Sequence, residues 1–405
     1  MVENKKAAKN VGKPRSSRHS GKESDPLPGQ RRKGIKLRKI TIENFKVLEE
    51  LKLEFPAPRM KDDPDIFVMG SINGLGKTSV LEAISLLLIG AAFGKEEFMD
   101  MFRFPARSQG INFPELMIRA GSSSSAIEGD FHFEGSKSQS DLFGDHTNFI
   151  KMQFNRNGRA EMKGDTSSFK KIFPKLDMMR KAPPDLIAEE FLYALIGLDS
   201  NPLLVPPLLY FHSYRKVQEG NPELGMMIEP DTLYPKRYFR RKDIAISAFK
   251  IAILRSLMSK GGLFENIEDK ESGLILDTLN NLVKKFAGGS IEKLRPSPDN
   301  TLEFRITPGN GGKSYPFDGL SSGQKEIIST LFLVWQNTHA TPGIVLIDEP
   351  ELHMNVQWQL GFIRTLHELA PDNQYIIATH SEDIFESVDQ GRRILLTPSK
   401  LKGGA

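Results

Sequence analysis

The stretch SINGLGKTS, residues 71–79, decides the fold because it joins a predicted strand to a predicted helix through a glycine-rich turn. The apolar run IFVMG at 66–70 comes directly before it and is typical of a buried strand. The following SVLEAISLLLIG, residues 79–90, carries its apolar residues at helical spacing. A strand, a glycine-rich turn and a helix in this order predict an α/β fold with a phosphate-binding loop.

The residue types in this loop suit a nucleotide bound with a cation. Gly74 and Gly76 can adopt backbone angles closed to other residues, so that consecutive N–H groups turn inward around phosphate oxygens. Lys77 can reach the β- and γ-phosphates, and the Thr78 hydroxyl can bind Mg²⁺. The predicted nucleotide contacts of this segment come from Asn73, Gly74, Leu75, Gly76, Lys77, Thr78 and Ser79. A turn that holds no ligand is the alternative, and the placement of Gly-Lys-Thr disfavours it.

A second motif, IVLIDEPE at 344–351, begins with an apolar run suited to a strand buried on both faces. Ligands bind at the carboxyl ends of the strands in open parallel sheets, which is where its carboxylates fall. We expect Asp348 to hold the Mg²⁺ shell and Glu349 to polarise the attacking water as general base. A solvated acidic turn would explain an isolated Asp-Glu pair, but the phosphate loop upstream favours the catalytic interpretation.

A third motif, LSSGQKE at 320–326, opens a segment with helical spacing, and the start of a helix can bind an anion. The alternative is a plain capped helix, with Ser321 or Ser322 as the cap and Glu326 closing a capping box. Its place 20 residues before the acidic strand favours contact with a γ-phosphate. The candidate residues are Ser321, Ser322, Gly323 and Gln324.

The three motifs in this order resemble the ATPase heads of the ATP-binding-cassette type, in the branch that contains SMC proteins, RecF and the OLD-family ATPases. The resemblance covers residues 36–90 and 300–397, and the segment LRKITIENFKVLEELKLEFP looks like the first hairpin of that branch. It implies an α/β P-loop NTPase fold: a mixed or parallel central sheet, an antiparallel β lobe and a helical insertion.

The resemblance also implies a role for each motif residue. Lys77 and Thr78 match the Walker A pair, and Asp348 and Glu349 match Walker B. Ser321 and Gly323 match the signature loop, which contacts the γ-phosphate bound by an opposing subunit. In IIATHSEDIF, residues 376–385, His380 falls on the histidine that senses the γ-phosphate. The resemblance therefore assigns catalytic roles to Glu349, His380 and Lys77, metal binding to Thr78 and Asp348, and ATP with Mg²⁺ as cofactors.

Composition and charge limit the class of protein. The chain of 405 residues has no cysteine, which argues against a disulfide-stapled secreted protein and against cysteine metal sites. No apolar stretch approaches 18 residues, and the N-terminus lacks a hydrophobic signal core, so we expect a cytoplasmic protein without a membrane partner. Residues 1–40 carry a net charge of +10, which leaves −6 on the rest.

The chain divides into four predicted parts: a disordered basic arm at 1–34, a first lobe of the head at 35–165, a helical insertion at 166–290, and a second lobe at 291–405. AIEGDFHFEG and NFIKMQFNRNG alternate like strands, with NRNG as a hairpin turn. Helices are predicted over 183–198, 242–260 and 267–288. PPLLYFHSYRKVQ contains a strand, after which Arg215 approaches phosphate or a partner, or else forms a structural ion pair.

Stand-alone OLD-like ATPases resemble the ATPase components of bacterial anti-phage systems. We therefore predict an ATPase that forms a dimer or higher oligomer around ATP and controls a partner effector, a nuclease, in such a system. Only 25 residues follow His380, so we expect the nuclease on another protein. The alternatives are a RecF-like or SMC-like ATPase acting on DNA and an assembly scaffold with little turnover. The basic arm fits either non-specific nucleic-acid binding or a solubilising tail.

Overall fold

The computed structural model describes residues 34–60, 63–70, 74–96, 113–134, 146–173, 176, 195, 202–217, 219, 249–250, 253, 269–296 and 302–398. The predicted basic arm and the predicted helices at 183–198 and 242–260 lie almost wholly outside these residues. Their structure and the four domain boundaries therefore stay predictions.

A six-stranded sheet carries the acidic strand and the strand before the phosphate loop. Its order is β14-β3-β13-β12-β8-β7. The strands are β3 (Asp65–Gly70), β7 (Leu203–Val205), β8 (Leu208–Phe211), β12 (Ile344–Asp348), β13 (Gln374–Thr379) and β14 (Arg393–Leu395). All neighbours pair in parallel except β7 and β8, so the sheet is mixed, as predicted. Because β3 lies beside β13, segments from the two ends of the chain meet in one sheet.

The predicted antiparallel lobe is a five-stranded sheet with the order β2-β1-β4-β5-β6. Its strands are β1 (Ile35–Phe45), β2 (Leu48–Glu54), β4 (Ser124–Phe133), β5 (His146–Asn155) and β6 (Ala160–Gly164). Buried residues alternate with less buried ones along the second half of β4, because successive side chains point to opposite faces. The predicted NRNG turn joins β5 to β6.

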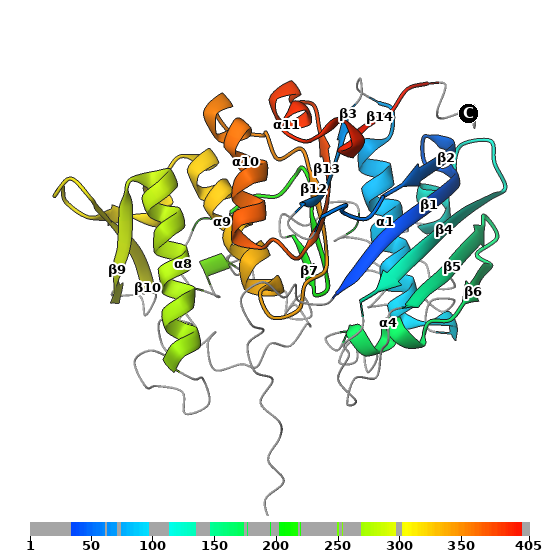
Figure 1. Ribbon diagram of the computed structural model, residues 1–405, viewed down its shortest axis with the longest axis horizontal. Coiled ribbons are helices and arrows are strands. Elements are labelled where there is room, and N and C mark those ends of the chain that lie inside the picture. Colours follow the sequence, from blue (N-terminus) through cyan, green and yellow to red (C-terminus); the bar gives the residue numbers. More distant parts are fainter. Residues whose placement is uncertain are drawn as a thin grey trace, which may run out of the picture. The chain divides into compact units, whose positions relative to one another are not determined.

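Helix α1 (Lys77–Phe93) lies between the two sheets, as Figure 1 shows. Every residue of α1 except Thr78 is buried, because most of the helix is apolar and its buried Glu82 pairs with Lys46. Its side chains form one hydrophobic core, which we call the inner core, with the five-stranded sheet and one face of the central sheet. Phe67 and Met69 of β3 and Leu346 of β12 belong to this inner core.

The opposite face of the central sheet forms a second, outer core with three helices. They are α8 (Asp269–Ala287), α9 (Ser322–Thr338) and α10 (Val356–Leu369). Val345 and Ile347 of β12 belong to the outer core. Helix α8 confirms the helix predicted at 267–288, and Gly288 at φ 69° ends it as predicted.

A three-stranded antiparallel sheet after α8 was not predicted, and its order is β11-β10-β9. Its strands are β9 (Gly289–Pro296), β10 (Leu302–Pro308) and β11 (Tyr315–Pro316). The remaining short elements are α3 (Phe113–Met117), α4 (Ser167–Ile172), η3 (Phe317–Gly319), α11 (Glu382–Glu386) and η4 (Gln390–Arg392). No helix within the described ranges is long and apolar enough to span a membrane.

Candidate nucleotide site

The glycine-rich turn leads from β3 into the N-terminus of α1. Gly74 has φ 81° and Gly76 has φ 89°, which is the left-handed region that favours glycine. A Cβ at Gly76 would lie 2.6 Å from the end of the Leu48 side chain, which would have to shift. The structure is not described for Asn73, whose predicted contact stays a prediction. The described half of the loop fits a phosphate-binding turn at a helix N-terminus.

Lys77, the first residue of α1, lies beside the predicted switch histidine. Its Nζ is 3.3 Å from Nδ1 of His380, and only 5% of the residue is exposed. Burial lowers the pKa of Lys77, and the nearby Glu349, Asp348 and Glu351 carboxylates oppose that change. The two ends of the chain thus place a buried ammonium group among three carboxylates, where it can meet an anionic phosphate.

Thr78 and Asp348 lie together at the carboxyl end of β12. The Thr78 hydroxyl donates to Oδ2 of Asp348 at 2.8 Å, and Asp348 is fully buried. Oδ1 of Asp348 is buried and has no hydrogen-bond partner among the described residues. Burial raises the pKa of Asp348 to about 7, while the Thr78 hydrogen bond opposes this rise. A hydroxyl and a carboxylate with a spare buried oxygen fit a Mg²⁺ site of the kind completed by phosphate oxygens and water.

The predicted general base follows Asp348 directly. Glu349 has φ 46°, unusual for a residue other than glycine, and its N–H donates to the Ala378 carbonyl at 2.8 Å. Its Oε1 lies 3.5 Å from Nε2 of His380. The side chain is 28% exposed, so water can reach its carboxylate. Glu349 and Lys77 therefore contact the two ring nitrogens of the same histidine.

Glu351, which the sequence analysis did not single out, forms two hydrogen bonds at the end of β13. Its Oε1 accepts a hydrogen bond from the backbone N–H of His380 at 2.6 Å, and its Oε2 accepts one from the Thr379 hydroxyl at 2.7 Å. Both contacts hold the end of β13, from which His380 projects. The signal was present in the sequence as the second glutamate of DEPE, two residues after Glu349.

The signature segment begins α9 and has one of its two predicted caps, but a different residue closes the capping box. Ser321 is the N-cap and forms a capping box with Gln324, whose side chain accepts the Ser321 N–H at 3.0 Å. The prediction that Glu326 closes this box is wrong, because Gln324 is the third residue after the cap and Glu326 pairs with Arg215. Gln324 also donates to the Phe286 carbonyl at 3.0 Å, so its amide serves the fold of this chain.

Ser321 and Ser322 are exposed at the start of α9, while Gly323 is buried. A Cβ at Gly323 would lie 2.1 Å from the carbonyl oxygen of His353, so this glycine lets α9 approach the turn after β12. Within the described part of the chain, the side-chain hydrogen bonds of Ser321 and Gln324 run to each other and to α8. Both serines are exposed at the helix start, although the capping box engages the Ser321 side chain.

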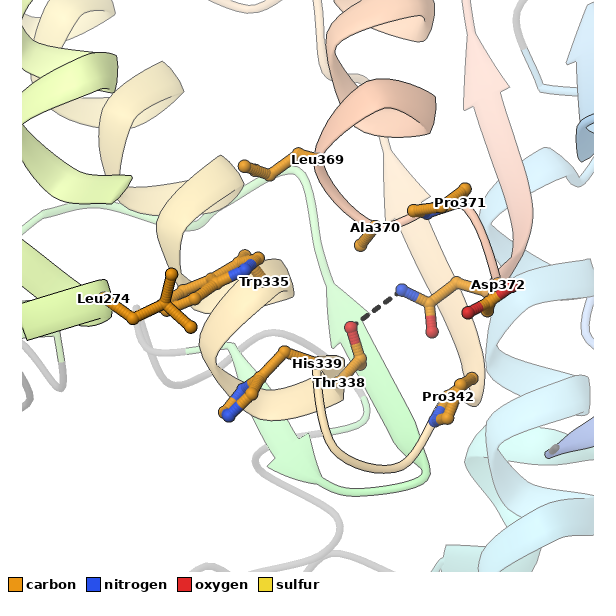
Figure 2. Close-up of a pocket in the computed structure, with 10 residues that line it drawn as sticks. Leu274, Trp335, Thr338, His339, Pro342, Leu369, Ala370, Pro371 and Asp372 are labelled. Atoms are coloured by element: carbon orange, nitrogen blue, oxygen red, sulfur yellow. Dashed lines mark hydrogen bonds between the residues drawn. The ribbon is translucent and has the colours of Figure 1, made fainter. Parts of the chain in front are cut away.

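The cavity in Figure 2 lies at the other end of the central sheet, away from these motifs. It has a volume of 210 Å³ and is reached where α9 and α10 end and β13 begins. Inside it, Asn373 donates to the Thr338 hydroxyl at 2.7 Å. The lining residues are Leu274, Trp335, Thr338, His339, Pro342, Leu369, Ala370, Pro371, Asp372 and Asn373. None of them is a predicted site residue.

The glycine loop, the acidic strand end and the capped α9 on a mixed sheet define a P-loop ATPase of the ABC type. The chain belongs to the family described as "AAA domain, putative AbiEii toxin, Type IV TA system", which matches residues 72–386. The match contains all the predicted site residues and confirms the expected class of nucleotide-binding ATPase.

Two named proteins share part of this chain. The Retron Vc95 probable ATPase of Vibrio cholerae serotype O1 biovar El Tor is 26% identical over 148 residues, or 34% of this chain. Septu protein PtuA of Bacillus mycoides (strain KBAB4) is 39% identical over 54 residues, or 13% of this chain. The matches span only 28% of the retron protein and 8% of the Septu protein.

Several solved ATPase heads have similar structures. The SMC head bound to the C-terminal winged-helix domain of ScpA is 15% identical, with a TM-score of 0.48 over 87% of this chain and 92% of that one. The recombination mediator RecF is 14% identical, with a TM-score of 0.39 over 87% of this chain and 95% of that one. With TM-scores below 0.5, these structures add nothing to the topology described above.

Proposed function

We propose that this chain hydrolyses ATP in a site completed by a second copy, and that closure of the dimer controls a partner effector. The proposal rests on the proximity of Thr78 and Asp348, whose side chains are 2.8 Å apart although they come from opposite ends of the chain. This contact brings the two Walker motifs to one point. The unpartnered Oδ1 of Asp348 leaves that point ready for a cation.

Each site residue has a distinct task in the proposed reaction. Lys77 binds the terminal phosphates, and Thr78 with Asp348 holds Mg²⁺, which when bound neutralises phosphate charge. Glu349 accepts a proton from the water that attacks the γ-phosphate. Glu351 holds the backbone N–H of His380, and the His380 ring orients that water and the phosphate. These residues act by position and charge, as phosphoryl transfer requires.

The exposed serines support the dimer. Ser321 and Ser322 lie at the start of a helix, where N–H groups and the helix dipole favour an anion. The capping box occupies the Ser321 side chain from within, and Ser322 stays exposed. A γ-phosphate bound to a second copy would meet this helix end, which gives ATP a contact with both molecules.

A mixing experiment tests the shared site. Lys77→Ala removes the phosphate contact, and Ser322→Glu places a negative charge where the second copy's phosphate would lie. Glutamate in the first helical turn is favourable for α9, so the second variant keeps its fold. We expect each variant alone to be inactive and an equimolar mixture to regain about a quarter of wild-type ATP hydrolysis, since half of the dimers are mixed and each has one intact site. A mixture without activity contradicts the shared site.

Nucleotide binding provides the simpler test of the phosphate loop. Lys77→Ala should lose binding of a fluorescent ATP analogue, because a buried cation no longer meets the phosphates. Retained binding would contradict the assignment of Lys77.

For the effector, we propose a nuclease on another protein in an anti-phage system. Similarity to a retron's probable ATPase and to a Septu protein supports this choice, as does membership of a family described with a toxin–antitoxin system. The test is purification from the native host with and without ATP, followed by the mass and nucleic-acid content of the complex. A stoichiometric protein partner is expected. DNA alone, with hydrolysis that DNA stimulates and raised salt abolishes, would favour the alternative of a RecF-like ATPase.

A further inference from the structure

Arg215 is a buried arginine whose guanidinium contacts the backbone of both Walker B residues. It follows β8, and 6% of the residue is exposed. Nη1 donates to the carbonyl oxygen of Asp348 at 2.6 Å and to that of His212 at 3.0 Å. Nη2 donates to the carbonyl oxygen of Glu349 at 3.2 Å. One side chain thus binds the carbonyls of two consecutive residues, the proposed metal ligand and the proposed general base.

The same arginine is paired with the signature helix. Its Nε lies 2.8 Å from Oε1 of Glu326, and the two side chains are 3% and 8% exposed. Neither atom has an aligned hydrogen bond among the described residues, so the contact is an ion pair. Burial raises the pKa of Glu326, and the positive charge of Arg215 opposes this rise. Glu326 lies one turn after Ser322 on α9, directly behind the exposed end of that helix.

The backbone conformation of Glu349 indicates what the hydrogen bonds from Arg215 do. A left-handed conformation at a residue other than glycine costs about 1–3 kcal/mol and persists only where its surroundings hold it. The Glu349 N–H is held by the Ala378 carbonyl and its C=O by Arg215. Arg215 therefore helps to fix the direction in which the Glu349 carboxylate leaves the end of β12.

Stability alone does not account for the buried pair. Desolvation of two charges cancels much of their attraction, and apolar residues of similar volume often stabilise a fold as well or better. A planar guanidinium, however, offers several donors in fixed directions. Arg215 uses three of its nitrogens on two elements, Walker B and α9, and this geometry transmits the position of one to the other.

We propose that Arg215 and Glu326 form a relay that aligns Glu349 and Asp348 for hydrolysis according to the position of the signature helix. When a second copy presses its nucleotide against Ser321 and Ser322, α9 and Glu326 move together, and Arg215 carries the displacement to the two Walker B carbonyls. Arg215 is in this view a positioning residue, and the relay rests on the proposed ATPase function. Binding of ATP does not need the relay, whereas turnover does.

The test compares Arg215→Lys and Glu326→Gln with a matched control. Arg215→Lys keeps the positive charge but cannot reach both carbonyls and the Glu326 carboxylate at once, and Glu326→Gln removes the negative charge; both preserve most of the side-chain volume. Asp65→Asn is the control, because Asp65 is 2% exposed and pairs with Arg38 at 3.1 Å, but at the opposite end of the central sheet. Measurements are the Kd of a fluorescent ATP analogue, kcat and KM for ATP hydrolysis, and the melting temperature.

In both relay variants we expect kcat to fall about 30-fold while Kd and KM change less than about threefold, because the loss is confined to the transition state. The double variant should be no slower than the slower single variant, since the residues act as a unit. Asp65→Asn should lower the melting temperature at unchanged kcat. If Arg215→Lys does not fold, the kcat of Glu326→Gln provides the test, because glutamine has the same shape as glutamate.

The outcomes separate the relay from the proposed function. If wild-type protein turns over ATP and the relay variants keep its kcat while losing melting temperature like the control, the pair is structural and the relay is wrong. Equal losses in nucleotide binding and kcat would also overturn it, because the pair would then support the phosphate loop as a whole. Wild-type protein without ATP turnover would overturn the proposed function itself, and the relay with it.

Discussion

Replacing Asp348 with asparagine should stabilise the protein in the absence of Mg²⁺ while removing its response to Mg²⁺. Asp348 is fully buried, and burial raises its pKa from 3.8 to about 7. At 1.36 kcal/mol per pKa unit, burying the ionised carboxylate above pH 7 costs about 4 kcal/mol of folding free energy. A neutral amide in the same place must still be desolvated, which offsets roughly half of that gain. The expected stabilisation is about 2 kcal/mol, or about 2–3 °C in melting temperature for a chain of this length.

The sign of the pH dependence follows from the raised pKa. Between about pH 4 and 7 the folded protein keeps a proton on Asp348 that the unfolded chain has released. The free energy of unfolding therefore falls as pH rises through this window, by at most about 1.4 kcal/mol per unit. Above pH 7 the free energy of unfolding no longer changes through Asp348, because its carboxyl group is ionised in both states. The advantage of Asp348→Asn over wild type should accordingly be about 2 kcal/mol smaller at pH 5.5 than at pH 8.

The assay is thermal unfolding at both pH values in EDTA, repeated with ATP and excess Mg²⁺. Mg²⁺ with ATP should raise the wild-type melting temperature well above that of the asparagine variant, because only a carboxylate provides the charge for the cation. Asp277→Asn on the exposed side of α8 is the control and should change nothing. The reasoning is refuted if Asp348→Asn is less stable than wild type at pH 8 without Mg²⁺, or if its advantage does not depend on pH.

Three further substitutions probe the site. Glu349→Gln should bind ATP normally, hydrolyse it at least about 100-fold more slowly and accumulate as an ATP-bound dimer in size-exclusion chromatography; normal turnover would exclude Glu349 as the base. Glu351→Gln weakens the hold on the His380 N–H, so kcat should fall about tenfold at unchanged ATP affinity, and an unchanged kcat would leave Glu351 without a positioning role. Gly323→Ala places a Cβ 2.1 Å from the His353 carbonyl oxygen and should cost about 1–3 kcal/mol of unfolding free energy in denaturant titrations, whereas a neutral result would show that α9 can shift there freely.

The predicted parts of the fold are those that local pattern defines strongly. Helix α1 could be predicted from the helical spacing of its apolar residues, and β12 from an apolar run suited to a strand buried on both faces. The meeting of Thr78 with Asp348 followed from a general rule, since the carboxyl ends of parallel strands lie at one edge of a sheet. These features need no knowledge of long-range contacts.

The features that sequence reasoning missed depend on contacts between distant residues or on helix register. The ion pair of Arg215 was one of the two predicted alternatives and is confirmed. Its contact with the Asp348 carbonyl was not predicted, because the two residues lie 133 positions apart and no periodicity links them. Ser321 was one of the predicted caps of α9, but Gln324, three residues later, closes the capping box, and Glu326 pairs with Arg215 instead. The β9–β11 sheet was not predicted from local pattern, and its antiparallel pairing joins residues on either side of a turn.

The division of the interior into two cores has a mechanical consequence. Helix α1 packs against a sheet on both sides, so we expect the part of the molecule that would bind the phosphates to stay rigid. The signature helix belongs to the other core, and the two halves share the thin central sheet. The strands of the central sheet contribute to both cores: in β12, Ile344 and Leu346 belong to the inner core, and Val345 and Ile347 belong to the outer core. We therefore expect movements that follow ATP hydrolysis to occur in the half that contains α8, α9 and α10. A controlled partner should bind to that half.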